Sequence, residues 1–185
     1  MFDIELTGSF IIAGIFILSI LGMNFQLLET SALNNMQTMA QENIAEVASI
    51  IEFDLRKAGY GVPPATTAIL AISDTTIRFL ADIDQNGTPD TMNYRLSSRS
   101  DAAGTENPND RYLYRSVNGS ENDVGIGLTD LRFNFYSATG NQTTNLDSIR
   151  TIRIGFSVQT LFAYNGQYGS AGWSSQTSPK NLGNI

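Results

Sequence analysis

Residues 6–23, LTGSFIIAGIFILSILGM, decide the fold of this chain, because they carry no charge and are apolar on nearly every side. They lie in a stretch, residues 1–60, that contains no proline, and the GYG segment at 59–61 followed by Pro63 is typical of a helix end. At 1.5 Å per residue, one helix over this stretch would extend about 90 Å. This length exceeds the width of a domain built from the remaining residues, so we expect part of the helix to protrude.

The second half of this stretch, residues 24–59, is amphipathic rather than apolar all round. Its apolar residues recur at steps of three and four, which places them on one helix face: Ile44, Val47, Ala48, Ile51 and Leu55. A protruding apolar rod joined to an amphipathic segment predicts that the first half is covered by a bilayer or by other copies, and that the second half packs on a domain.

After Pro63 and Pro64 the apolar period changes from helical to two. Alternation of this kind is typical of half-buried antiparallel strands. It predicts strands at residues 69–72, 75–81, 92–96, 112–117, 128–137 and 152–158. The sequence therefore predicts an α+β fold, with a helix over residues 1–60, a transmembrane or filament-core segment at 6–23, and a β-rich globular domain at 61–185 packed on the helix.

The composition excludes several classes of function. The chain has 185 residues, a net charge of −7 and a pI of about 4.4, which argues against nonspecific nucleic-acid binding. It contains no Cys, so no disulfide can form, and no His, the commonest general base and transition-metal ligand. We find no nucleophile–base pair and no glycine-rich phosphate loop before a helix, and we expect no enzymatic activity.

The charges near the N-terminus are all acidic. No Lys or Arg occurs before Arg56, whereas Asp3 and Glu5 stand at the entrance of the apolar run. An unpaired carboxylate is costly beside apolar surroundings, so we expect Glu5 to pair with an α-amino group, its own or that of a neighbouring copy. The alternative is that Glu5 lies solvated among lipid headgroups. Because no basic n-region precedes the apolar run, we expect Met1 to be a new first residue after cleavage.

These residues carry a family resemblance. The charge-free helix entered through Glu5–Leu6 resembles the type IV pilin and pseudopilin superfamily, and FDLRKAGYG at 53–61 resembles the helix end of its longer, minor-pilin-like branch. The segment 178–182 is a weaker match to that branch. The resemblance implies that Met1 is the methylated N-terminus and that Glu5 neutralises the amine of an adjacent subunit during assembly.

Two helix positions add to this assembly set. Gly22 stands where many pilins carry proline, and together with Gly14 it weakens the helix by about 1 kcal/mol per glycine relative to alanine. The resemblance implies local unwinding between Gly14 and Gly22 in a filament. The alternative is that the two glycines permit close helix packing.

A second candidate site is the loop DIDQNGTPD at residues 82–90. Its oxygen-bearing residues follow the ligand order of an EF-hand calcium loop, with glycine at the sixth position. The predicted ligands of a structural Ca²⁺ are Asp82, Asp84, Asn86, the Thr88 carbonyl and Asp90. The bidentate glutamate expected at the twelfth position is replaced by Asn93, so a modest affinity is expected. The alternative is a hairpin tip that turns at Asn86–Gly87.

Three further segments have a weaker signal. The acidic loop 101–110 (DAAGTENPND) is expected to be solvated, with a second ion site as the alternative. Asn118 and Asn141 fit the N-glycosylation pattern, as does Asn86. The tail from Tyr164 is rich in Gly, Ser and Asn, but its aromatic residues predict that it lies on the sheet or on a neighbour.

The resemblance implies a structural subunit of an extracellular type IV pilus-like filament that self-assembles through its N-terminal helix, in adhesion, motility or surface attachment. Its expected partners are further copies of itself and the pilus assembly machinery, including a prepilin peptidase. Its expected location is the bacterial cell surface, with the inner membrane holding the precursor. The first alternative is a minor pilin or pseudopilin that primes or caps a pilus or a type II secretion pseudopilus. The second is a membrane-anchored exported enzyme.

Overall fold

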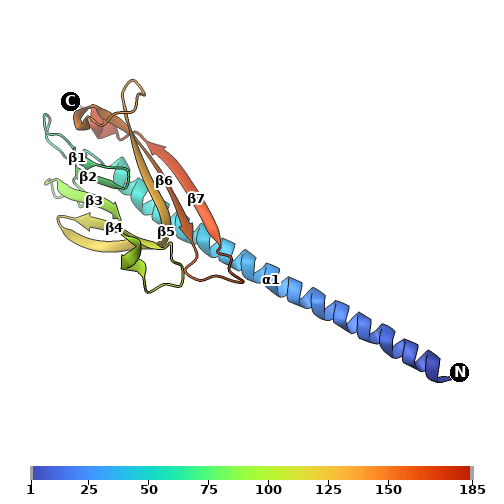
Figure 1. The fold of residues 1–185 in the computed structure, drawn as a ribbon. Coiled ribbons are helices and arrows are strands. Elements are labelled where there is room, and N and C mark those ends of the chain that lie inside the picture. Colours follow the sequence, from blue (N-terminus) through green and yellow to red (C-terminus); the bar gives the residue numbers. More distant parts are fainter. Residues whose placement is uncertain (1, 184–185) are drawn as a thin grey trace.

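The computed structural model describes residues 2–183, and its first element is a single helix, α1 (Phe2–Arg56). Figure 1 shows the N-terminal half of α1 extending alone from a globular part that contains the rest of the chain. The helix ends four residues before the predicted Tyr60, because Gly59 adopts φ +80° and donates its backbone N–H to Leu80 instead of continuing the helix. The glycines at 59 and 61 predicted the region in which the helix ends, and the hydrogen bond from Gly59 to Leu80 sets the end of α1 within that region.

The seven strands within residues 2–183 belong to one antiparallel sheet in which each strand pairs with the next along the chain. The strands are β1 (Ile69–Ile72), β2 (Thr76–Ala81), β3 (Asp90–Leu96), β4 (Arg111–Val117), β5 (Ser120–Ser137), β6 (Ile149–Gln159) and β7 (Ser170–Thr177). Three short 3-10 turns lie between or after them: η1 (Arg99–Ala102), η2 (Leu146–Ser148) and η3 (Lys180–Gly183). This confirms the predicted α+β class.

The largest differences between the sheet and the prediction are in two strands. β5 begins at Ser120 rather than at residue 128, because its first residues continue the hairpin with β4 through two register shifts. β7 was not predicted as a strand; it forms from the polar tail, and Trp173 pairs with Phe156 of β6. The tail therefore lies on the sheet, which was one of the two predicted placements. Because it is rich in glycine and serine and lacks apolar alternation, the sequence did not indicate a strand there.

The core lies between the inner face of the sheet and the second half of α1. The predicted helix face from Ile44 to Leu55 is buried, and so are the predicted inward residues of β6 from Ile152 to Val158. Gly125 permits this contact, because a Cβ at that position would overlap the Val47 side chain. Burial of such side chains contributes about 1.5–3 kcal/mol each for the larger residues, so the helix and the sheet form one cooperative unit.

One charged cluster is buried inside this core. The carboxylate of Asp54, on α1, accepts a hydrogen bond of 2.6 Å from the Tyr94 hydroxyl and an ion-pair contact of 2.6 Å from Nε of Arg115. Asp54 and Tyr94 are almost inaccessible to solvent. Burial, followed by the charge of Asp54, raises the pKa of the Tyr94 hydroxyl above its ordinary value. The cluster joins α1 to β3 and β4 by directional bonds.

Replacing Tyr94 by phenylalanine removes one of the hydrogen bonds to the buried Asp54 while keeping the ring. We expect Tyr94→Phe to lower the free energy of unfolding by about 1–3 kcal/mol, the usual cost of depriving a buried charged group of a hydrogen bond. Thermal unfolding of the full chain in detergent measures the change. Tyr112→Phe is the matched control, since no hydrogen bond of its hydroxyl contributes to this cluster, and equal melting temperatures for the two variants would contradict the assignment.

Candidate functional site: the exposed apolar helix and the acidic loop

The first candidate site is the apolar half of α1, which nothing in the described chain covers. Its most apolar 18-residue window has a mean hydropathy of 2.2 and is 0% buried, and by length and composition α1 can cross a membrane. Fifteen large apolar side chains are between 46% and 80% exposed: Ile4, Leu6, Phe10, Ile11, Ile12, Ile15, Phe16, Ile17, Leu18, Ile20, Leu21, Met23, Phe25, Leu27 and Leu28. A soluble monomer rarely exposes an apolar patch beyond a few hundred Å². This surface therefore requires an apolar environment.

The hydroxyl side chains of this segment are already hydrogen-bonded within the helix. The hydroxyl of Thr7 donates to the Asp3 carbonyl at 2.6 Å, Ser9 donates to the Glu5 carbonyl at 2.9 Å, and Ser19 donates to the Ile15 carbonyl at 2.9 Å. Burying a hydroxyl without a partner costs about 1–3 kcal/mol, and these bonds remove that cost. The three hydroxyl residues of the segment are thus compatible with apolar surroundings.

The predicted assembly residues lie along this same segment. The Glu5 side chain is exposed in the first turn of α1, and none of the ion pairs among residues 2–183 includes it. Met1 lies outside the described residues. α1 is continuous through Gly14 and Gly22, and no side chain occupies the space beside either glycine. The unwinding expected in a filament stays a prediction, and the open space is available for close packing.

The second candidate site is the acidic loop between β2 and β3. One carboxylate oxygen from each of Asp82, Asp84 and Asp90 lies within 4.8 Å of the others. Asp82 and Asp90 are buried, whereas Asp84 is exposed. Hard cations such as Ca²⁺ prefer clustered carboxylates of this kind, and like charges so close repel one another without a counter-ion. The structure thus brings three of the five predicted ligands together.

The remaining two predicted ligands, Asn86 and the Thr88 carbonyl, belong to the same turn. Asn86 donates from its carboxamide to Asp84 at 2.8 Å and accepts from the Thr88 N–H at 2.8 Å. The backbone N–H groups of Asn86 and Gly87 donate to the two oxygens of Asp82 at 3.1 and 3.0 Å. Gly87 has φ +86°, which favours glycine. The three clustered carboxylates are suitable for Ca²⁺, but the same bonds stabilise the turn without an ion, so calcium binding stays a prediction.

Sequence reasoning missed the residues that hold this loop in place. Asn118, in the β4–β5 turn, donates from its carboxamide to Asp90 at 2.6 Å and accepts from the Thr91 N–H at 2.8 Å. Lys57 donates to the Ile83 carbonyl at 3.1 Å. A Cβ at Gly61 would come within 2.7 Å of the Asp82 side chain, so only glycine fits there. The sequence shows an asparagine–glycine turn pattern at 118–119, but it does not show that Asn118 bonds to Asp90 of β3.

The other predicted polar positions have different surroundings. The carboxamide of Asn118 is engaged on both sides by the bonds to β3, and Asn141 is exposed beside Thr139. The acidic loop 101–110 is solvated only in part, because Asn107 is buried and donates to Gln159 and Thr160. Glycosylation at either asparagine stays a prediction. The loop anchors to the end of β6.

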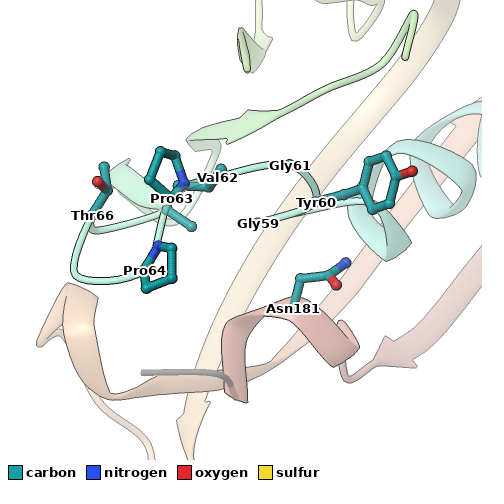
Figure 2. A pocket seen from close by; sticks show the side chains of 9 residues that line it. Gly59, Tyr60, Gly61, Val62, Pro63, Pro64, Thr66 and Asn181 are labelled. Carbon is teal, nitrogen blue, oxygen red and sulfur yellow. The ribbon is translucent and has the colours of Figure 1, made fainter. Parts of the chain in front are cut away.

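A hollow of about 270 Å³ lies where the chain leaves α1. Figure 2 shows Pro63 and Pro64 on one side of it and Asn181 on the other. Its lining has no carboxylate and no basic group, and Gly59 packs directly against the backbone of Asn181. These residues dock the C-terminal turn η3 against the helix end, and they offer no acid–base pair for chemistry.

Asp110 is a buried carboxylate outside both candidate sites. It is 1% exposed, and neither of its oxygens has a hydrogen-bond partner among the described residues. The hydroxyl of neighbouring Thr105 directs its hydrogen bonds to the carbonyls of Ala102 and Asn107. Burial therefore raises the pKa of the Asp110 carboxyl above its ordinary value.

Comparison of the chain with protein-family models, with curated proteins and with solved structures found no match. Function is therefore inferred from the long apolar helix packed on an antiparallel sheet and from the residues of the two candidate sites.

If the loop binds Ca²⁺, added Ca²⁺ raises the melting temperature of the full chain in detergent, because a ligand at 100 times its Kd stabilises the folded state by about 2.7 kcal/mol. Asp84→Ala should remove this increase. Asp84 is the suitable position, since it is exposed and its hydrogen bonds stay within the turn. Asp123→Ala, another exposed carboxylate, is the control. A calcium response that survives in Asp84→Ala would show that the ion binds elsewhere.

The raised pKa of Asp110 makes the stability of the fold depend on pH. A carboxyl whose folded pKa exceeds its unfolded value stabilises the fold below the unfolded pKa, and this contribution is lost as pH rises through the folded pKa. Asp110→Asn removes the buried charge, so it should raise the melting temperature at pH 7 by about 2–4 °C, with a smaller increase at pH 4. A variant that melts lower than the wild type at pH 7 would contradict the burial of an unpaired charge.

Proposed function

We propose that this chain is a structural subunit of an extracellular type IV pilus-like filament, assembled by packing the apolar halves of α1 from many copies. The observation that supports this most directly is a helix whose most apolar window is 0% buried while its continuation is part of a folded core. An anchor alone requires only a span of about 20 apolar residues. Here the same helix continues rigidly into the domain, so packed helices would carry the domains on the outside.

The proposal assigns each half of the molecule a role. The segment 6–23 holds the subunit in the inner membrane before assembly and lies in the filament core afterwards. The sheet domain faces outward for adhesion, motility or surface attachment. The partners are other copies of this chain and an assembly machinery that includes a prepilin peptidase. The net charge of −7 argues against nonspecific binding to nucleic acid.

The minor-pilin or pseudopilin role is the second candidate, because the segment 53–61 resembles the helix end of the longer, minor-pilin-like branch. In this part of the chain Arg56 pairs with Glu52 at 2.9 Å, and Lys57 lies 4.5 Å from the centre of the Phe53 ring while it donates to the acidic loop. Both roles require the same apolar contacts and differ in copy number. A membrane-anchored enzyme is the least supported of the three roles, because the hollow at the end of α1 is lined by no carboxylate and no basic group.

Glu5 provides the test. When apolar helices pack, its carboxylate loses water and requires a cation, which the amine of an adjacent copy supplies. We expect Glu5→Gln to reduce filament yield at least tenfold, as judged by electron microscopy of sheared surface material, while the subunit remains folded in the membrane. Mass spectrometry of wild-type filaments separates the two candidates, since a main component is a major subunit and a trace component is a minor one.

Glu42→Gln is the matched control, because Glu42 is exposed on α1 beyond the apolar half. It should assemble like the wild type. Wild-type filament yield from Glu5→Gln would contradict the pairing with a neighbouring amine. If the wild-type chain remains in the membrane and is absent from surface filaments, the filament proposal itself is wrong.

A further inference from the structure

The loop between β3 and β4 contains a buried carboxylate that no protein group neutralises. Asp110 is 1% exposed, and neither of its side-chain oxygens has a hydrogen-bond partner among residues 2–183. Buried charges in proteins are normally paired, hydrogen-bonded or bound to a metal, because the loss of hydration is otherwise too costly. The surroundings of Asp110 therefore indicate which kind of group this carboxylate binds.

Oxygen atoms from three other residues of the loop gather beside Asp110. Thr105 Oγ1 lies 3.1 Å from the Ala102 carbonyl oxygen and 3.2 Å from the Asn107 carbonyl oxygen. Burial raises the pKa of the Asp110 carboxyl, and the neighbouring Thr105 hydroxyl acts in the opposite direction. The Asn107 carbonyl also accepts the backbone N–H of Asp110 at 3.1 Å. We call these four groups the oxygen cluster: the Asp110 carboxylate, the Thr105 hydroxyl and the carbonyls of Ala102 and Asn107.

The oxygen cluster has more acceptors than donors. A threonine hydroxyl has one proton, whereas a carbonyl has two lone pairs and a carboxylate only accepts. The Ala102 carbonyl already accepts the Thr105 backbone N–H at 3.1 Å, and the Asn107 carbonyl accepts that of Asp110. Their second lone pairs and both Asp110 oxygens therefore compete for a single hydroxyl proton. A cation removes this competition, because it is bound by lone pairs and requires no donor proton.

Arg111, the next residue in the chain, does not supply this cation. Its Nε atom is itself buried without a hydrogen-bond partner, and none of the ion pairs within residues 2–183 includes Arg111 or Asp110. The other charged side chains of the loop, Arg99, Asp101 and Glu106, are exposed and can remain in water. The charge of Asp110 is therefore left for an ion from solution.

We propose that the oxygen cluster binds a sodium ion, independently of the proposed function and of the acidic loop 82–90. A single carboxylate neutralises a single positive charge, whereas a divalent ion would leave a buried charge uncompensated. Oxygens about 2.3 Å from a small ion and at right angles to one another are about 3.3 Å apart, close to the separations around Thr105. The larger potassium ion would require these oxygens to spread.

The surroundings of the cluster give the ion access and a structural role. A hollow of about 390 Å³ is lined by Ala102, Thr105 and Asn107, so an ion with its water can reach these oxygens. The carboxamide of Asn107 donates to the Gln159 side chain and to the Thr160 carbonyl, each at 3.1 Å. An ion on the Asn107 carbonyl would thus fix the β3–β4 loop against the end of β6, and the stability of the domain would depend on sodium.

Thermal unfolding of the full chain in detergent tests the site, with NaCl compared with choline chloride at equal ionic strength. We expect sodium to raise the melting temperature of the wild type by about 2–4 °C, because it binds the folded state only. Asp110→Asn should melt above the wild type in choline chloride, since the unpaired charge is removed, and should not respond to sodium. Thr105→Val, which removes one ligand, should require at least threefold more sodium for half of the increase.

Two controls separate this site from other effects of salt. Glu106→Gln changes an exposed carboxylate of the same loop, and Asp84→Ala changes the acidic loop; both should keep the full sodium response. Equal melting of the wild type in the two salts, or a sodium response that persists in Asp110→Asn, would overturn the proposal. An equal response to KCl would overturn the assignment of a small ion. A sodium response that appears only in Arg111→Met would show that Arg111 neutralises Asp110 in the wild type, and the proposal would be wrong.

Discussion

The structure depends on one contact, between the apolar face of the second half of α1 and the inner face of the sheet. Residues from Ala40 to Leu55 on the helix and from Ile69 to Val158 on the strands form a single cluster of buried side chains. The sheet alone would expose this inner face, and the helix alone would expose a second apolar stripe. Each element therefore makes the other soluble, and neither is expected to form separately.

The first half of α1 is the continuation of an element whose other half is already fixed. Helix formation is cooperative, so a folded second half acts as a nucleus from which the helix extends at little cost per residue. The domain thus presents residues 4–28 as a straight rod without any contact of its own to that rod. The same rigidity makes the rod suitable for packing, because a flexible segment would lose its conformational freedom on assembly.

The sequence predicted the elements whose side chains follow a regular period. The helix face and the inward residues of β6 were identified because burial imposes periods of 3.6 and 2 on the sequence. β7 was missed since its residues, SAGWSSQT, are mostly exposed on an edge strand and carry no apolar alternation. The ligand order of residues 82–90 was found in the sequence because all the predicted ligands lie within nine consecutive residues. Asn118 and Gly61 were not found, since their roles arise from contacts between segments far apart in the chain.

Apolar burial is not directional, and by itself it would leave a long helix free to slide along a sheet. Specific contacts at both ends of the packed half remove this freedom. At one end the carboxamide of Gln37 donates to the Ser170 carbonyl at 2.7 Å, and Gly169 packs so closely on Met36 that no Cβ fits. At the other end the backbone N–H of Gly59 donates to the Leu80 carbonyl at 2.8 Å, and the backbone N–H of Asp82 donates to the Tyr60 carbonyl at 2.8 Å. The domain is thereby held at one axial position on α1. Because the exposed rod belongs to this fixed frame, its axial position relative to the domain is set within the chain itself.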